Sequence, residues 1–208
     1  MASSSFDRSH RSREVRRRDF VSALEQLLVD GRPFSEITVQ QLADEVGLSR
    51  TGFYFHFGHT RDALLAAATG VASDVYEAAE LWLGDDDAGF DGLEAALARI
   101  AETYRSHGPV LRAVCEAAAY DDAVRVERRQ IIGRFIVATR RRLERSTPGH
   151  SRGLQAAALV WMTERTLLEH VATDGDDPAP ISTALARIWW AALEDPAPRA
   201  RTAQSETA

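Results

Sequence analysis

The stretch from Thr38 to Phe57 constrains the fold of this chain more than any other part of the sequence. Thr38 is a suitable N-cap, and Gln41 three residues later completes a capping box. Gly47 suits the left-handed position that ends a helix, and Ser49 can cap a helix that follows. The sequence therefore predicts two short helices joined by one tight turn, which is the pattern of a helix-turn-helix.

Apolar residues at the starts of these two helices support the prediction. Ile37 and Leu42 occupy the hydrophobic-staple positions of the first helix, and Leu48 and Phe53 occupy those of the second. Some aromatic residues of the second helix belong to the core, but one short helix in a small unit cannot bury aromatic rings all round. The side chains left to face outward are those of Arg50, Thr51, Tyr54, Phe55 and His56. Such side chains can bond phosphates and base edges, so we expect DNA binding.

The segment Gly-Leu-Ser-Arg-Thr-Gly-Phe-Tyr-Phe-His-Phe, residues 47–57, resembles the signature of TetR family transcriptional regulators. The resemblance implies an all-α protein with an N-terminal three-helix DNA-binding domain that contains the helix-turn-helix. It also implies a C-terminal helical bundle that binds an effector and forms the dimer. We expect the DNA-contacting residues to be Thr38, Gln40, Ser49, Arg50, Thr51, Tyr54, Phe55, His56, Thr60 and Arg61.

Two positions depart from the family pattern. Thr60, a plausible N-cap of the next helix, stands where family members usually have a phosphate-contacting Lys, and Gly52 has no side chain where many relatives have Thr. Arg61 could supply the charge that Thr60 lacks.

The distribution of charge separates the chain into parts. The net charge is -6, yet the first eighteen residues contain a cluster of arginines, whereas runs of aspartate come later. We expect a disordered basic arm over 1–12, the DNA-binding domain over 13–59, the effector-binding and dimerisation domain over 60–194, and a disordered tail over 195–208. The arm could follow DNA phosphates or enter the minor groove. The single cysteine excludes an intramolecular disulfide, and the polar start lacks a signal-peptide core, so we expect a cytoplasmic protein.

Helical periodicity continues after the helix-turn-helix. Further helices are expected over about 60–83, 92–106, 109–119, 122–145, 151–173 and 180–193, after a first helix over 13–30. The last two helices are apolar over more than one face, which favours a four-helix homodimer interface to which each subunit contributes a pair. The alternative is a well-covered monomer core. The arginines at 128, 129 and 140–142 are expected on a solvated face.

Polar residues interrupt the apolar pattern of the helix over 151–173. Glu164 is costly to bury without a partner, which could be Arg165 or a ligand. The segment 162–167 resembles the ethionamide-resistance regulator branch of the family, in which it lines a ligand tunnel. The residues expected to line an effector pocket are Ile100, Tyr104, Phe135, Thr139, Trp161, Thr163 and Glu164, with Trp189 near it. The alternative is that these residues form ordinary core.

The expected function is that of a ligand-responsive repressor, released from a near-palindromic operator by a small apolar or amphipathic effector. One alternative is a constitutive DNA-binding regulator without an effector. The other is an enzyme that uses the C-terminal pocket, but Glu164, His107 and His170 show no nucleophile-base spacing. The acidic stretches lack the ligand spacing of a calcium loop. We therefore expect no catalytic residues, no metal and no cofactor.

Overall fold

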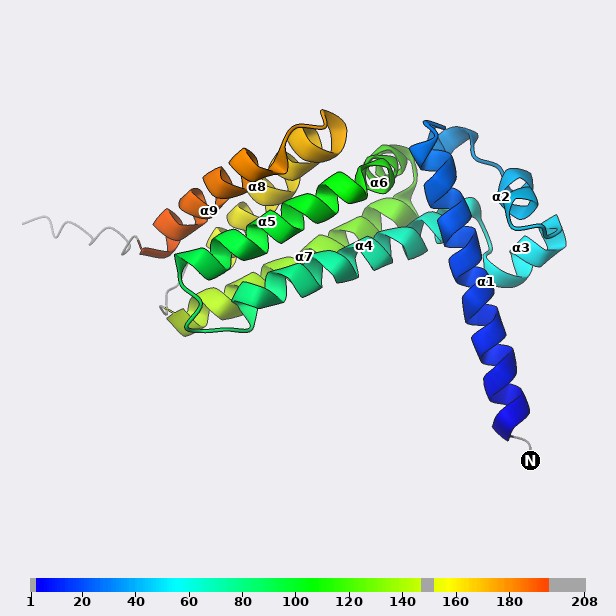
Figure 1. Ribbon diagram of the computed structural model, residues 1–208, viewed down its shortest axis with the longest axis horizontal. Helices are drawn as coiled ribbons and strands as arrows, with labels where there is room; N and C mark the ends of the chain where they lie inside the picture. The colour runs from blue at the N-terminus through cyan, green and yellow to red at the C-terminus, as the bar shows by residue number, and fades with distance from the viewer. Residues whose placement is uncertain (1–2, 147–151, 195–208) are drawn as a thin grey trace, which may run out of the picture.

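The computed structural model describes residues 3–146 and 152–194, and all regular structure in these ranges is helical (Figure 1). This confirms the predicted all-α class. The elements are α1 (Ser3–Val29), a 3₁₀ turn (Phe34–Glu36), α2 (Val39–Glu45), α3 (Arg50–His56), α4 (Thr60–Leu83), α5 (Phe90–Ser106), α6 (Gly108–Tyr120), α7 (Asp122–Ser146), α8 (Arg152–Thr166), a π-helical turn (Leu167–Thr173) and α9 (Pro178–Glu194). Helices α1 to α3 form a head at one end, and α4, α5, α7, α8 and α9 form an elongated body.

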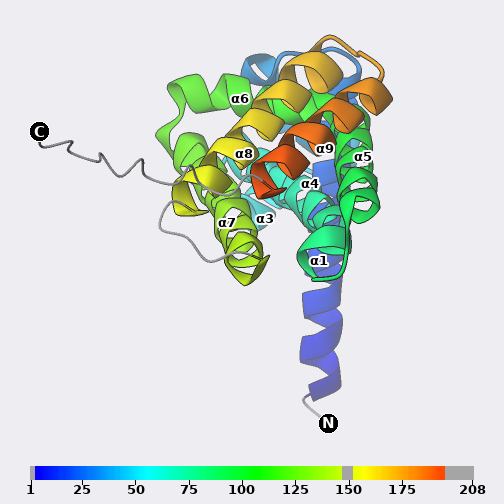
Figure 2. The same cartoon turned by 90° about the vertical axis from the view of Figure 1, so that its left-hand side faces the viewer.

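Helix α1 begins ten residues earlier than the sequence predicted. Residues 3–12 are helical, so the expectation of a disordered arm there is corrected. The physical reason is that the stretch Ser3–Val29 contains neither proline nor glycine, and nothing stops the helix from continuing toward its start. Figures 1 and 2 both show this part of α1 projecting beyond the rest of the molecule. The tail expected at 195–208 lies outside the described residues.

The core of the head is built around Phe20 of α1. Its ring meets Phe53 edge-on at a centroid distance of 5.2 Å and Phe57 at 6.2 Å. The same apolar cluster continues into Leu64 of α4 and Val110 of α6. Helix α6 packs against both α1 and the 3₁₀ turn. Apolar packing is continuous across residue 59, so it does not mark a boundary between two domains there. The domain boundary expected after residue 59 therefore stays a prediction.

Helix α6 also contacts the π-helical turn that follows α8. The sequence predicted one continuous α-helix over 151–173, and this turn is where the structure differs from that prediction. The backbone comes so close here that a Cβ on Gly108 would lie 2.8 Å from the Ala172 carbonyl oxygen. The Arg112 guanidinium donates a hydrogen bond to that same oxygen. Within the turn, the Thr173 hydroxyl donates to the Leu168 carbonyl at 2.8 Å. The start of α6 is therefore fixed between the head and the C-terminal helices.

Among the described residues, no helix has the length and apolar character needed to cross a membrane.

Candidate DNA-binding head and effector cavity

The helix-turn-helix forms as the sequence predicted. The Thr38 hydroxyl accepts a hydrogen bond from the Gln41 amide at 3.3 Å, and the Gln41 side chain accepts from the Thr38 amide at 2.8 Å. Gly47 has a φ of 68° and ends α2, which confirms the left-handed position. The Ser49 hydroxyl accepts from the Gly52 amide at 3.2 Å and caps α3. Side-chain caps therefore fix the start of both helices.

The outer face of α3 presents polar and aromatic side chains to solvent. Tyr54 is 50% exposed, and no carboxylate in the described part of the chain pairs with Arg50. The other expected contact residues that are exposed are Thr38, Gln40, Ser49, Thr51 and Phe55, while Gln40 also donates to Asp44 at 2.7 Å. These residues form the face that is available to a DNA groove.

His56 is turned toward α1, which corrects the expectation that it faces outward. Its ring lies 5.7 Å from that of Phe20, and its Nδ1 atom is buried without a hydrogen-bond partner among the described residues. The reason is helical geometry, because position 56 follows Phe53 by three residues and shares its inward face. Burial lowers the pKa of His56, and the positive charges of Arg13 and Arg17 lower it further.

The residues at the start of α4 are already engaged. Thr60 is the first residue of the helix and not its cap; His59 precedes it, and the His59 amide donates to the Asp62 carboxylate at 2.8 Å. The Arg61 guanidinium lies 3.3 Å from the Asp121 carboxylate at the start of α7. The charge expected to compensate for Thr60 is therefore partly neutralised within the protein.

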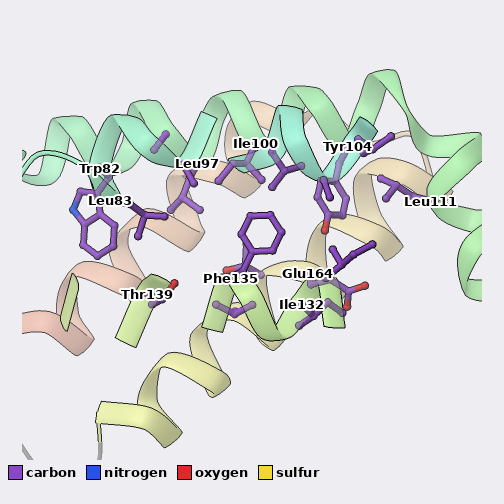
Figure 3. A pocket seen from close by; sticks show the side chains of 18 of the residues that line it. Trp82, Leu83, Leu97, Ile100, Tyr104, Leu111, Ile132, Phe135, Thr139 and Glu164 are labelled. Atoms are coloured by element: carbon purple, nitrogen blue, oxygen red, sulfur yellow. The ribbon is translucent and has the colours of Figure 1, made fainter. Parts of the chain in front are cut away.

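A cavity of about 140 Å³ lies inside the body (Figure 3). Six of the seven residues expected to line a pocket do line it, namely Ile100, Tyr104, Phe135, Thr139, Thr163 and Glu164, and so does Trp189. The wall from α4 was not anticipated from the sequence, and it consists of Ala68, Val71, Ala72, Val75, Ala79, Trp82 and Leu83. These small and apolar residues recur with helical periodicity, a signal that a core helix gives equally well.

Trp161 does not line the cavity, so its expected role is corrected. It is partly exposed, and the Arg128 guanidinium lies over its ring at 5.6 Å. Two residues along a helix amount to a rotation of about 200°, so Trp161 faces away from the side on which Thr163 lines the cavity.

Glu164 pairs with Arg128 rather than with Arg165. The Arg128 Nη2 atom lies 2.5 Å from the Glu164 Oε1 atom, with both side chains largely buried, whereas Arg165 pairs with Glu169 on the surface. Arg128 was expected on a solvated face, and this expectation is corrected. Cation and carboxylate come from α7 and α8, which the sequence could not place side by side.

Arg142 is also buried, which is a second correction to the expected solvated face. It is 5% exposed and donates to the carbonyls of Trp82, Asp85 and Asp86 at 3.2–3.3 Å. Helix ends leave carbonyls without partners, and a cation there is favourable. Arg142 therefore stabilises the end of α4 and the loop after it.

Apolar side chains remain exposed on α8 and α9. Leu154 and Trp161 lie seven residues apart on one face of α8, and Ile188 is exposed on α9. The two helices are joined by hydrogen bonds, including one from Gln155 to the Ala192 carbonyl at 2.5 Å. This is the surface expected to form the dimer.

One cluster of possible metal ligands was not anticipated. His170, Asp174 and Asp176 lie in and just after the π-helical turn, and their ligand atoms lie within 4.8 Å of one another. The His170 Nδ1 atom lies 3.2 Å from the Asp176 carboxylate. All three residues are exposed, and exposed acidic groups commonly lie together without an ion, so we assign no metal site here.

Comparisons with known proteins agree with this geometry. Residues 26–68 match the family model described as bacterial regulatory proteins, tetR family. The comparison with curated sequences gives no match.

Solved structures share the fold. A putative transcriptional regulator from Pseudomonas aeruginosa PAO1 is 14% identical with a TM-score of 0.69, covering 86% of this chain and 90% of that one. The TetR family regulator PfmR from Thermus thermophilus is 16% identical with a TM-score of 0.65, covering 85% and 99%. The TetR family repressor AlkX from Dietzia sp. strain DQ12-45-1b, implicated in biodegradation of n-alkanes, is 20% identical with a TM-score of 0.53, covering 85% and 94%. This chain therefore has the fold of TetR family regulators and carries the family's DNA-binding helix-turn-helix within residues 26–68.

Proposed function

We propose that this protein is a cytoplasmic, homodimeric repressor that binds a near-palindromic operator and leaves it when a small apolar effector binds. The observation that carries the proposal is the outer face of α3, where Arg50, Thr51 and Tyr54 are exposed on a helix with a fixed start. Two such helices, one from each subunit, would enter successive major grooves.

The three side chains have different expected roles in the groove. Arg50 can donate two hydrogen bonds to a guanine edge or to a phosphate. Thr51 can bond a base edge or phosphate or contact a thymine methyl group, and the Tyr54 hydroxyl can donate to a phosphate. Because the protein as a whole is acidic, binding would depend on these local contacts and on the arginines of α1.

The test is retention of genomic DNA fragments by the purified protein, followed by a gel mobility shift with one retained fragment. Tyr54→Ala should lose binding with little change in melting temperature, because the Tyr54 side chain is half exposed. Tyr120→Ala is the control, since Tyr120 is 58% exposed and lies outside the helix-turn-helix. An unchanged shift with Tyr54→Ala would contradict the proposed role of α3.

The dimer is supported by the exposed apolar side chains of α8 and α9. Exposed Leu154, at 79%, and Ile188 are costly in water but suit a helical interface. A Leu154→Glu variant should elute as a monomer in size-exclusion chromatography. It should also lose affinity for a full operator, because each half-site would then bind independently.

The effector is supported by the cavity, whose lining is mostly apolar with few polar groups. AlkX is implicated in biodegradation of n-alkanes, compounds that would suit so apolar a lining. The more specific resemblance to the ethionamide-resistance branch stays a prediction.

Helix α6 offers a route from the cavity to the head. Leu111 and Val114 line the cavity, while Val110 and Val114 belong to the apolar cluster of the head. An effector would change DNA affinity only to the extent that it binds one head arrangement more tightly than the other. Displacement of a retained DNA fragment by a cavity ligand would be the direct measurement.

A further inference from the structure

The cavity is apolar along most of its wall, and the charged side chains of its lining lie at one end. Figure 3 shows the Tyr104 hydroxyl and the Glu164 carboxylate reaching toward the end near Leu111. Trp82 and Thr139 lie at the opposite end. Arg128 joins the polar end through its ion pair with Glu164. A ligand in this cavity would therefore meet strong hydrogen-bonding groups at one end.

The polar end is balanced in charge. The Arg128 Nη2 atom lies 2.5 Å from Glu164 Oε1, and the two side chains are 23% and 13% exposed. An anionic ligand would compete with Glu164 for Arg128 and be repelled by the Glu164 carboxylate. A cationic ligand would compete with Arg128 for Glu164 and be repelled by the Arg128 guanidinium. Either would leave one charge without a full partner in a poorly solvated site, which is unfavourable. The pair therefore favours a neutral ligand.

Tyr104 has an unused hydroxyl at this end. The residue is 9% exposed, and its hydroxyl has no hydrogen-bond partner among the described residues. Burial raises the pKa of Tyr104, and the nearby Glu164 charge raises it further, so the phenol stays protonated. Buried hydroxyls are nearly always bonded, and one that faces a cavity without a partner is available to a ligand.

The size of the cavity limits what fits. Its volume is about 140 Å³, close to an engineered apolar cavity of about 150 Å³ that holds benzene. The rings of Trp82, Tyr104, Phe135 and Trp189 contribute to the wall. A small aromatic molecule matches both the volume and the lining.

We propose that the cavity takes a neutral, largely apolar molecule of the size of a substituted benzene, with one hydroxyl group placed against Tyr104 and Glu164. The ligand hydroxyl accepts a hydrogen bond from the Tyr104 O–H and donates one to the second carboxylate oxygen of Glu164. This inference rests on the proposed function only in taking the cavity as the effector site.

The test compares four probes of matched shape by isothermal titration calorimetry at neutral pH. They are 4-ethylphenol, 4-ethyltoluene, 4-ethylbenzoate and 4-ethylbenzylammonium, which carry a hydroxyl, no polar group, a negative charge and a positive charge. We expect 4-ethylphenol to bind most tightly and the two ions most weakly. Tyr104→Phe should weaken 4-ethylphenol about fivefold, the usual effect of one neutral hydrogen bond, and leave 4-ethyltoluene unchanged.

Thr139→Val is the matched control, because Thr139 lines the opposite end of the same cavity and should not alter the preference for 4-ethylphenol. The inference is overturned if 4-ethyltoluene binds the unmodified protein as tightly as 4-ethylphenol, a comparison that does not require any variant to fold. It is also overturned if an ionic probe binds most tightly or if none of the four binds. Retention of DNA fragments and the gel mobility shift with Tyr54→Ala test the proposed DNA-binding function, and neither depends on the four probes. Failure of the ligand inference can therefore be distinguished from failure of the proposed function.

Discussion

Arg17 of α1 donates through Nη1 to the His56 backbone carbonyl at 2.7 Å, and its guanidinium lies over the Phe57 ring at 4.3 Å. Arg13, one turn earlier, donates to the Phe55 carbonyl at 3.2 Å and lies over the Phe55 ring at 4.9 Å. The last carbonyls of a helix lack partners within the helix and favour a nearby cation. Two arginines of α1 thus hold the end of α3 that lies opposite the Ser49 cap.

Arg17→Gln should loosen α3 against α1. We expect a loss of about 1.5–3 kcal/mol in unfolding free energy, the range for a hydrogen bond that involves a charged group, and weaker DNA binding through a less well-ordered α3. Chemical denaturation and a mobility shift measure the two effects. Arg16→Gln is the control, because Arg16 is exposed and pairs only with Asp19 at 3.2 Å among the described residues. Equal losses in the two variants would show that the contact with α3 is unimportant.

His56 should make the stability depend on pH. Its pKa is lowered in the folded protein from 6.5, so below about that pH the unfolded chain binds a proton that the folded chain does not. Stability should therefore fall as pH drops below 6.5 and level off once the folded state is also protonated. His56→Gln should flatten this part of the curve of unfolding free energy against pH. If the unfolding free energy changes equally with pH in the unmodified protein and in His56→Gln, then His56 is not the source of the pH dependence.

The Arg128–Glu164 pair should be costly to break from one side only. Glu164→Ala leaves a largely buried guanidinium without its partner and should cost about 3 kcal/mol of unfolding free energy. The double variant Arg128→Met with Glu164→Leu should recover most of that loss, because no isolated charge remains. Glu169→Ala removes the exposed partner of Arg165 and should cost less than about 1 kcal/mol. Urea denaturation of the unmodified protein and the three variants tests the order.

Gly108→Ala should destabilise the junction between α6 and the π-helical turn. The added Cβ would lie 2.8 Å from the Ala172 carbonyl oxygen, so the backbone must shift, at a cost of about 1–3 kcal/mol. Gly133→Ala is the matched control inside α7, where a Cβ meets nothing within 4 Å. That change should stabilise by about 0.5–1 kcal/mol because alanine favours the helix. Melting temperatures that move the same way in both variants would contradict this account.

Local sequence signals were sufficient for the helix-turn-helix. Thr38, Gln41, Gly47 and Ser49 act on neighbours within a few residues, so their capping and turn roles could be predicted and are confirmed. The start of α1 differs from the sequence prediction, because a Ser- and Arg-rich composition is typical of disorder but contains no residue that breaks a helix.

The sequence by itself determined the all-helical class and the two caps and turn of the DNA-reading unit. All of these follow from periodicity and from interactions over one or two helical turns. Only the tertiary structure decided that His56 faces α1, that Trp161 lies outside the cavity and that Arg128 pairs with Glu164. The physical reason is distance along the chain. Arg17 and His56 are separated by 39 residues and Arg128 and Glu164 by 36, and no local pattern records which helices bring such residues together.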